Sequence, residues 1–451
     1  MGKGTSLIYS DRTDVGRRRA SNQDSKSVVP PSGPQQYRAR GWMFLVADGM
    51  GAHAAGEMAS QIAAERVPLV YEKAAQHSPP LALRQSIEQT NAEINAKGES
   101  AVEYRGMGTT CTALVLLPRG ALVGHIGDSR AYRVRGRTIE QLSCDHSLVW
   151  ELEAAGGISR EEAAGAVPKN IITRSMGPHP HVKVDLEGPH SVEEGDTFVL
   201  CSDGLSGQVA DEEIGLFVAE LEPREATAAL VGLALVRGAP DNVTVIVARA
   251  GAEEVSSKAA PGDELWALTE EPVALTGRAA VPWKWLALAA GSLFAALILS
   301  PTSILITQLG DLIGKQLAEP VSYIGCGVAA IVFLGSLVAA FIGFLAPTGG
   351  NGRALLPGQR LGKGPYRTYD CTPTEGLVER IVASIETAAA GLADNDRERT
   401  TVILGRVRRH VAEGGFHEAV VALAEAIAIY ARAVEQSRSG DTIRGPTPTD
   451  A

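Results

Sequence analysis

The chain has 451 residues and a formal net charge of −10 at pH 7. This length exceeds what one hydrophobic core usually serves, so we expect two or more structured parts. The net negative charge offers no basic surface for binding nucleic acid, so we exclude nucleic acid as a partner. Five cysteines are dispersed without paired spacing, which argues against a disulfide framework or a zinc site. The first residues lack an apolar stretch long enough for a signal peptide, so we expect the chain to start in the cytosol.

Residues 1–250 alternate short apolar runs with amphipathic segments. Buried strands are expected at Trp42–Ala47, Cys111–Leu117, Ala121–Ile126, Thr197–Cys201 and Val243–Ala248, most of them bounded by Gly, Pro or Asp. Apolar residues at helical spacing predict helices at about Glu57–Ala75, Leu81–Lys97, Ser147–Glu153 and Pro223–Val236. The mixture indicates one domain of sheets covered by helices.

Two long apolar stretches follow a linker at 251–282, which is rich in Ala, Glu, Pro and Ser. We expect transmembrane helices at 283–309 and 321–346, because each reaches the roughly 20 apolar residues that a bilayer requires. Pro301 predicts a kink or a break in the first of them, since proline removes a backbone donor.

The charges beside these stretches predict their orientation. Basic residues flank both outer ends, whereas the connecting loop carries Asp311, Lys315 and Glu319. The positive-inside rule therefore places both termini in the cytoplasm and predicts a two-span protein of the cell (inner) membrane. The short loop leaves little outside to bind a ligand, so we expect anchoring in the lipid bilayer, or dimerisation, rather than sensing.

The remainder of the chain is expected to be a second linker at 347–373, a small helical region at 374–436 and a disordered tail at 437–451. An apolar seam with alternating steps of four and three residues predicts a helix, and its members are Phe416, Val420, Leu423, Ile427, Tyr430 and Val434. The seam is short, so packing within the chain is favoured over a dimeric coiled coil.

Four aspartates stand where expected strands stop or start: Asp48, Asp128, Asp203 and Asp241. A carboxylate at the end of a buried strand is costly to desolvate unless something compensates it. One such residue alone would be read as a turn aspartate. Four at equivalent places, with no nearby His/Cys pattern, favour a site for Mg²⁺ or Mn²⁺.

At this point the sequence resembles the metal-dependent protein phosphatases, the type 2C serine/threonine phosphatases, of bacterial type. The resemblance runs from about Leu7 to Arg249 and rests on eight motifs in order: TDVGRRRASNQDS, VADGMGAHAAGEMAS, GMGTTCTAL, HIGDSRAYRVRG, DHSLVWELEAAGGISREEA, NIITRSMG, LCSDGLSG and APDNVTVIV. It implies an α+β fold in which a β-sandwich of two antiparallel sheets is flanked by helices (α-β-β-α). The transmembrane hairpin and the helical region would follow this domain.

The resemblance also implies roles for individual residues. Asp48 would bridge two ions (Mn²⁺ or Mg²⁺), and the carbonyl of Gly49 would complete one of their sites. Asp203 and Asp241 match ligands of the other ion, and Asp128 matches a third, weaker site.

Two residues near the start of the chain match the substrate side of the same site. Arg19 matches the arginine that binds the substrate phosphate, with Arg17 as the fallback in the run Arg17–Arg19. Asp24 matches the acidic residue that supports the metal-bound waters.

Two departures from the family pattern concern the loop after Asp48. Met50 stands where many eukaryotic members have a histidine proposed as the general acid, so the proton donor is unassigned. His53 is a candidate donor, and an ordinary hydrogen-bonding histidine is an equal alternative. Ala52 replaces the usual glycine of bacterial relatives.

The leading hypothesis is an active phosphatase, tethered to the cytosolic face of the membrane, that acts on phosphoserine and phosphothreonine in proteins. Its expected partners are phosphorylated proteins, including membrane-associated Ser/Thr kinases or their substrates. The alternative is a catalytically weak, phosphatase-like signalling scaffold. Degenerate relatives usually lose metal aspartates, and this chain keeps all of those expected.

Overall fold

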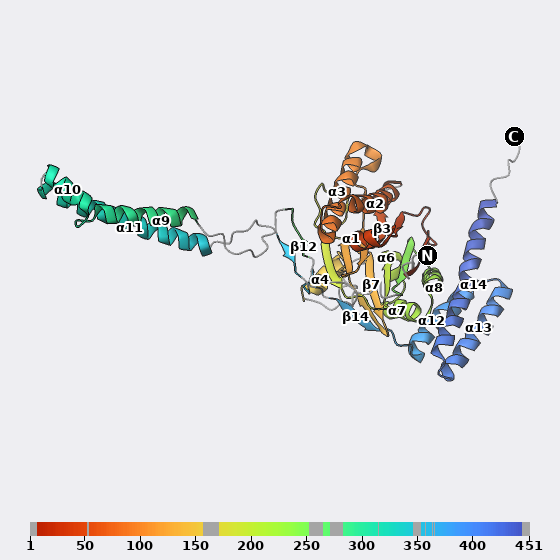
Figure 1. The fold of residues 1–451 in the computed structure, drawn as a ribbon. Coiled ribbons are helices and arrows are strands. Elements are labelled where there is room, and N and C mark those ends of the chain that lie inside the picture. Colours follow the sequence, from red (N-terminus) through yellow and green to blue (C-terminus); the bar gives the residue numbers. More distant parts are fainter. Residues whose placement is uncertain are drawn as a thin grey trace. The chain divides into compact units, whose positions relative to one another are not determined.

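The structure is a computed structural model, and it describes residues 7–51, 54–156, 171–251, 265–270, 283–313, 315–345, 353–356, 358–362, 364 and 366–443 (Figure 1). The chain divides into two compact units. One comprises residues 1–266 and 355–451, and the other comprises residues 267–354.

The larger unit is built on two antiparallel sheets. The first sheet has the order β1 (Ile8–Asp14), β11 (Val243–Arg249), β10 (Thr197–Cys201), β7 (Arg130–Arg135), β8 (Thr138–Gln141) and β14 (Arg367–Asp370). The second has the order β2 (Asp24–Val29), β3 (Trp42–Met50), β5 (Cys111–Leu117), β6 (Gly120–Ile126) and β9 (Asp185–His190), and β4 (Gly108–Thr109) pairs with β3. The five strands predicted from apolar runs are all present, and two of them have the predicted ends.

The core between the sheets forms from one apolar face of each. Phe44 and Leu114 of the second sheet belong to the same buried cluster as Phe198 and Ile246 of the first, and all four are fully buried. Buried apolar area of this kind is the main stabilising contribution to the fold.

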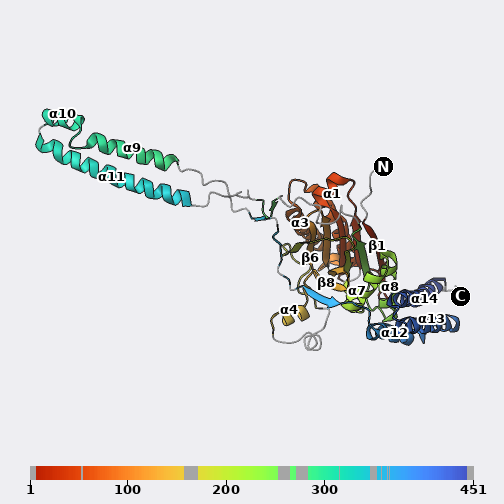
Figure 2. The same cartoon turned by 60° about the horizontal axis from the view of Figure 1, so that its bottom comes forward.

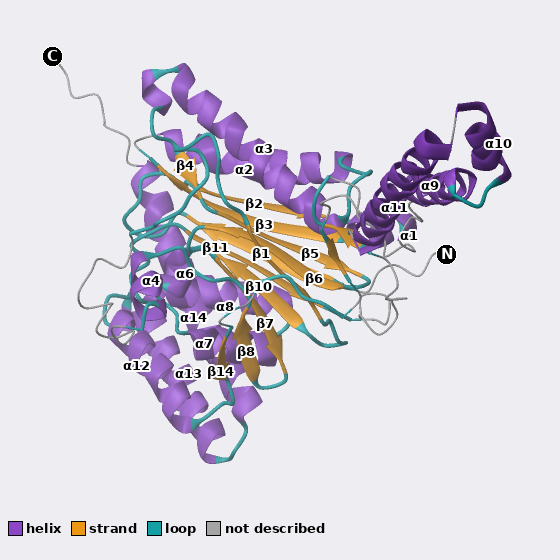
Figure 3. Cartoon of the chain, turned by 90° about the vertical axis from the view of Figure 1, so that its left-hand side faces the viewer, coloured by secondary structure: helices purple, strands orange, loops and turns teal. Residues whose placement is uncertain are grey.

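Helices cover both outer faces of the two sheets (Figure 3). The β2–β9 sheet carries α2 (Ala54–Lys73) and α3 (Pro79–Ser100), with α1 (Pro34–Arg40) and a 3₁₀ turn at Val102–Tyr104 nearby in sequence. The outer face of the β1–β14 sheet carries α6 (Asp203–Ser206), α7 (Asp211–Glu220) and α8 (Pro223–Val236). Helix α4 (Leu148–Ala154) follows β8 in the chain. These layers agree with the α+β sandwich that the resemblance implied.

Three further helices at the end of the described chain belong to the same unit: α12 (Glu375–Ala389), α13 (Asp394–Ala412) and α14 (Phe416–Ile443) (Figure 2). Helices α12 and α14 pack onto α8, and α13 packs against α12 and α14. The predicted seam on α14 lies inside one hydrophobic cluster with α8, and Val420, Leu423 and Ile427 are fully buried. The helical region is therefore an added layer on the two-sheet domain. The tail predicted from residue 437 begins as helix, because α14 continues to Ile443.

A strand lies where the sequence predicted a linker at 347–373. Residues Arg367–Asp370 form β14, which pairs with β8 from Arg367–Gln141 to Asp370–Thr138 and extends the first sheet. The prediction missed it because the four residues are polar and alternate between partly buried and exposed, so only the pairing with β8 makes them a strand.

The smaller unit consists mainly of apolar helices. These are α9 (Trp283–Leu299), α10 (Ile304–Ile313) and α11 (Lys315–Leu345), and short strands β12 (Trp266–Ala267) and β13 (Ala354–Leu355) pair where the chain enters and leaves. Among the described residues, one helix is long and apolar enough to cross a membrane, over Pro320–Phe341 with a mean hydropathy of 2.4.

The first span predicted at 283–309 is not continuous in this unit. Helix α9 has 17 residues and ends before Pro301, and α10 begins after it. At 1.5 Å per residue, α9 is about 25 Å long, somewhat less than the roughly 30 Å of a hydrocarbon core. The break has the cause that the sequence suggested, a proline that cannot donate a backbone hydrogen bond.

Candidate active site

Five aspartates gather at one end of the sandwich because each lies at the end of a strand. Asp24 opens β2 and lies opposite Asp48 of β3 in the antiparallel register. Asp203 begins α6 directly after β10, and Asp241 stands in the turn before β11. Asp128 lies in the turn between β6 and β7. The folding of the two sheets therefore brings together residues more than 200 positions apart.

Burial and mutual repulsion raise the pKa values of four carboxyl groups, those of Asp24, Asp48, Asp128 and Asp203. Burial is the main reason that the pKa of Asp24 rises to about 7, and Asp203 and Asp241 add to it. Burial and the charges of Asp203 and Asp145 raise the pKa of Asp128 to about 8. The pKa of Asp48 lies well above its ordinary value, from burial and then from the neighbouring Asp24 and Asp203. These groups are unfavourable to ionise together without a compensating cation.

Asp24 is held by two hydroxyl groups that the sequence reasoning did not single out. The hydroxyls of Ser202 and Thr244 donate to its Oδ2 at 2.8 and 2.6 Å. Ser202 also accepts from the backbone N–H of Thr244 at 3.0 Å, so β10 and β11 fix this carboxylate together. Thr244 could have been noticed in the sequence, because it is a polar residue inside the apolar run of β11.

The site fits a hard divalent cation. The Oδ1 atoms of Asp24, Asp128 and Asp203 are buried and accept no hydrogen bond from any described residue. Over the described ranges, no three acidic, His or Cys side chains are gathered as a closed ligand set. Mg²⁺ commonly takes only one or two carboxylates and keeps several waters, so such a site needs no closed set.

The turn after Asp48 leaves no room for a side chain. A Cβ on Gly49 would lie 2.1 Å from the carbonyl oxygen of Gly56 and 2.6 Å from that of Gln23. Thr110 also accepts from the N–H of Asp48 at 2.8 Å. The backbone carrying Asp48 and Gly49 is thus tightly fixed, as a carbonyl ligand would require.

Arg19 lies at the rim of this cluster. Its Nη2 is 2.7 Å from Oδ2 of Asp241, and half of its side chain is exposed. The hydrogen bond that Arg19 donates to Asp241 is the main cause of a raised pKa for Arg19. Arg17, the fallback for the phosphate ligand, instead donates from Nη1 to the hydroxyl of Tyr430 at 2.8 Å. The structure thus joins Arg19 to the aspartate cluster, whereas the candidate proton donor His53 lies outside the described residues.

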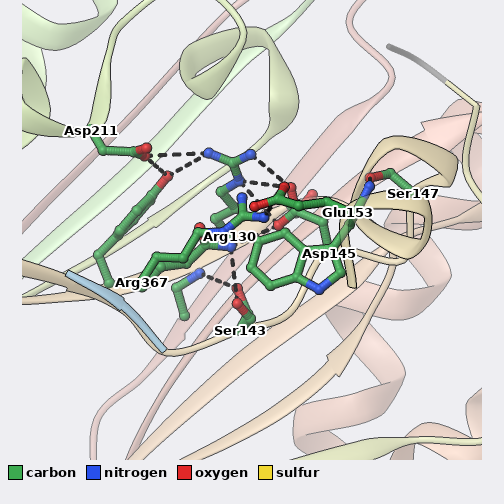
Figure 4. Close-up of polar contacts among 12 residues, drawn as sticks. Arg130, Ser143, Asp145, Ser147, Glu153, Asp211 and Arg367 are labelled. Carbon is green, nitrogen blue, oxygen red and sulfur yellow. Dashed lines mark hydrogen bonds and ion pairs between the residues drawn. The ribbon is translucent and has the colours of Figure 1, made fainter. Parts of the chain in front are cut away.

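A buried ion network anchors the turn that carries Asp128. Arg130, two residues on, donates to Asp145 from Nε at 3.0 Å and from Nη2 at 2.7 Å, and to Oδ1 of Asp211 at 3.3 Å. The hydroxyl of Tyr132 donates to the same Asp211 oxygen at 2.6 Å. Figure 4 shows Arg130 between the two carboxylates. Because its charge is compensated on both sides, Arg130 can be buried and hold the start of β7 in place.

Comparisons with known proteins identify the family of this chain. The model of the protein phosphatase 2C family matches residues 17–234. Protein phosphatase PhpP of Streptococcus pneumoniae is 36% identical over 247 residues, which are 54% of this chain and 97% of PhpP. The serine/threonine phosphatase stp of Listeria monocytogenes is 33% identical over 241 residues, 52% of this chain and 93% of that protein.

Solved structures with sequence similarity cover the same part of the chain. The serine/threonine phosphatase PstP/Ppp of Mycobacterium tuberculosis is 37% identical with a TM-score of 0.48, over 55% of this chain and 99% of that one. The catalytic domain of PstP in complex with two manganese ions is 35% identical with a TM-score of 0.46, over 55% and 99%. Because the chain covers nearly the whole length of PhpP and stp at 33–36% identity, it belongs to the protein phosphatase 2C family and is a protein serine/threonine phosphatase of bacterial type.

Proposed function

We propose that the enzyme hydrolyses phosphoserine and phosphothreonine in proteins by direct attack of water activated between two Mn²⁺ or Mg²⁺ ions, with a third, weaker ion site at Asp128. The observation that carries this proposal is the buried aspartate cluster, in which one carboxylate oxygen (Oδ1) of each of Asp24, Asp128 and Asp203 accepts no hydrogen bond from any described residue. Buried carboxylates in this state are stabilised by a cation.

Each residue has a separate task in this proposal. Asp48, Asp203 and Asp241, with the carbonyl of Gly49, would hold the ions. When bound, two such ions lower the pKa of a water between them and neutralise charge at phosphorus. Asp24, oriented by its hydroxyl donors, would accept hydrogen bonds from water beside the ions.

Arg19 would bind the phosphate oxygens. Its guanidinium group is partly exposed and carries donors in the planar arrangement that suits a phosphate dianion. Binding phosphate would take Arg19 away from Asp241, which frees that carboxylate for a cation.

The test uses the full chain in detergent with a phosphothreonine peptide as substrate. We expect activity only with Mn²⁺ or Mg²⁺ present, and at least a 100-fold loss in Asp48→Ala and Asp203→Ala. Titration calorimetry with Mn²⁺ should show binding to the wild type that either variant weakens. The control is Asp394→Ala on α13, whose side chain is 93% exposed. Undiminished activity in EDTA would refute the metal-activated mechanism.

We further propose that the apolar unit tethers the enzyme to the cell (inner) membrane, with both termini in the cytoplasm. Helix α11 supports this proposal, because only 17% of the residues in the most apolar stretch of Pro320–Phe341 are buried. Helix α9 packs along it, with the hydroxyl of Ser322 donating to the carbonyl of Leu299 and the thiol of Cys326 contacting the carbonyl of Ala296 at 3.5 Å. Large apolar side chains such as Phe294 and Phe341 are exposed on both helices. Contiguous exposed apolar surface of this kind marks a membrane or protein interaction site.

Fractionation and reporter fusions test the tether. The full chain should remain with membranes after alkaline carbonate extraction, and a chain lacking the apolar helices should not. A cytoplasm-dependent reporter fused after Ala451 should be active. A reporter there that works only outside the cytoplasm would refute the orientation.

A further inference from the structure

Three side chains of α14 contact the second half of β1 and the start of the loop that carries Arg19. Arg438 donates from Nη1 to both carboxylate oxygens of Asp14, at 3.1 and 3.3 Å, and from Nη2 to the carbonyl of Gly16 at 2.6 Å. Tyr430, which is 6% exposed, accepts from Arg17. In addition, Glu435 accepts from Arg12 at 3.1 Å. Helix α14 therefore contacts both β1 and the loop that follows it.

The same loop is tied to the aspartate cluster on its other side. The N–H of Arg17 donates to the carbonyl of Ala239 at 2.8 Å. The amide of Asn242, beside Asp241, donates to the carbonyls of Val15 at 2.8 Å and Ser21 at 3.0 Å. The loop is thus enclosed between α14 and the turn that carries Asp241.

Gly16 is the point of closest approach in this arrangement. It has a φ of +75°, and a Cβ there would lie 2.0 Å from the carbonyl oxygen of Asp241. Arg438 binds the carbonyl of this same glycine, and Asp14 accepts from its N–H at 2.8 Å. The Arg438–Asp14 pair is partly shielded, with side chains 32% and 12% exposed. A charge-assisted contact in such surroundings, made by a guanidinium group that also binds the Gly16 carbonyl, restrains the backbone more than an exposed ion pair does.

The contacts of α14 also separate the roles of two neighbouring arginines. The guanidinium group of Arg17 donates to the hydroxyl of Tyr430, and its central carbon lies 6.0 Å from the centroid of the Tyr430 ring. Arg19, two residues later, points to Asp241 and remains half exposed. Holding Arg17 on α14 leaves Arg19 as the arginine presented to the aspartate cluster.

We propose that Arg438 and Tyr430 are positioning residues for phosphate binding, which act by fixing the Asp14–Arg19 segment. This inference rests on the proposed role of Arg19 as the phosphate ligand. It makes the C-terminal helical layer part of the support of the active site, through its contacts with Asp14, Gly16 and Arg17.

The test is a double-mutant cycle in the full chain in detergent, with a phosphothreonine peptide as substrate and inorganic phosphate as a competitive inhibitor. Arg438→Ala should raise the KM for the peptide and the inhibition constant of phosphate roughly 3- to 10-fold, with kcat within about 2-fold, because the phosphate ligand is less well held. Arg438→Lys keeps a charge beside Asp14 and should recover part of the loss. In an Arg19→Ala background, Arg438→Ala should change KM by less than about 2-fold.

Matched variants separate positioning from general destabilisation. Arg432→Ala lies on the same helix, where the Arg432 guanidinium donates to the carbonyl of Ala428 of its own helix, and should leave KM unchanged. Tyr430→Phe keeps the packing and loses only the acceptor for Arg17, so it should also raise KM while melting within a few degrees of the wild type.

The outcomes distinguish this inference from the proposed function. If Arg19→Ala leaves KM unchanged, the role of Arg19 as phosphate ligand is wrong. If Arg19→Ala raises KM, but Arg438→Ala and Tyr430→Phe have no effect or add fully to it, the positioning role is overturned.

Discussion

The contact between α8 and α14 allows a quantitative test of whether the helical layer belongs to the phosphatase fold. Gly232 of α8 faces Ile427 of α14 so closely that a Cβ on Gly232 would lie 2.4 Å from Cγ2 of Ile427. Ile427 is fully buried within the cluster that unites the first sheet, α7, α8 and α12–α14. The perturbations are Ile427→Ala, Gly232→Ala and the two combined.

The expected magnitudes follow from this packing. Ile427→Ala removes a buried side chain and leaves a cavity, at a cost of about 2–5 kcal/mol. Gly232→Ala inserts a methyl group against a stiff β-branched side chain, which costs about 1–3 kcal/mol and is offset by about 1 kcal/mol of helix propensity. In the double variant the new methyl group occupies space that Ile427 has left. We therefore expect it to be at least about 1.5 kcal/mol more stable than the sum of the single effects predicts.

The assay is thermal unfolding of the full chain in detergent, with hydrogen exchange of the α8 and α14 amides as a local readout. For a unit of this size, 1 kcal/mol corresponds to about 1–2 °C. The control is Val421→Ala on α14, where the side chain is 44% exposed and a change below about 0.5 kcal/mol is expected. Strict additivity in the double variant would show that the two helices do not pack as described.

Three further predictions concern single residues. Burial raises the pKa of Glu187 to about 7, so its contribution to stability is complete below about pH 4.5 and is lost as the pH rises through 7. Glu187→Gln should therefore stabilise the protein by about 1 kcal/mol at pH 8 and not at pH 5 in thermal melts, after allowance for solvent screening. Asp145→Asn should cost about 3–5 kcal/mol in chemical unfolding, because it leaves Arg130 buried with less compensation; a cost under 1 kcal/mol would contradict the network. Gly204→Ala places a Cβ 1.9 Å from the carbonyl oxygen of Asn242 and should lower kcat/KM by at least about 10-fold, so wild-type kinetics would contradict this geometry.

Sequence patterns predicted the elements that are buried on both faces. The strands Cys111–Leu117 and Thr197–Cys201 and the helix Pro223–Val236 have the predicted ends, because continuous apolar runs bounded by Gly, Pro or Asp permit few alternatives. The edge strands β1 and β2 were not predicted. Their sequences, IYSDRTD and DSKSVV, are polar and partly exposed, and their pairing partners make them strands.

The sequence predicted which aspartates form the cluster, but it did not predict the contacts that hold the surrounding segments in place. The motif order of the resemblance pointed to Asp24, Asp48 and Asp203, and the structure gathers them at one end of the sandwich. Contacts such as Arg438–Asp14 join residues 424 positions apart. No local pattern predicts such a contact, since it depends on how α14 packs on α8.

The paired strands β12 and β13 have a consequence for how the enzyme is joined to its apolar helices. Residues 267–354 interrupt the larger unit rather than follow it, because the chain leaves after β11 and returns to contribute β14 to the same sheet. Leu268 donates its N–H to the carbonyl of Arg353 at 2.7 Å, so the two ends of the insertion are neighbours. A short turn in place of the insertion should therefore leave a closed, water-soluble phosphatase. By the same reasoning, a protease that cuts one connection cannot release the enzyme, because the other connection still holds it.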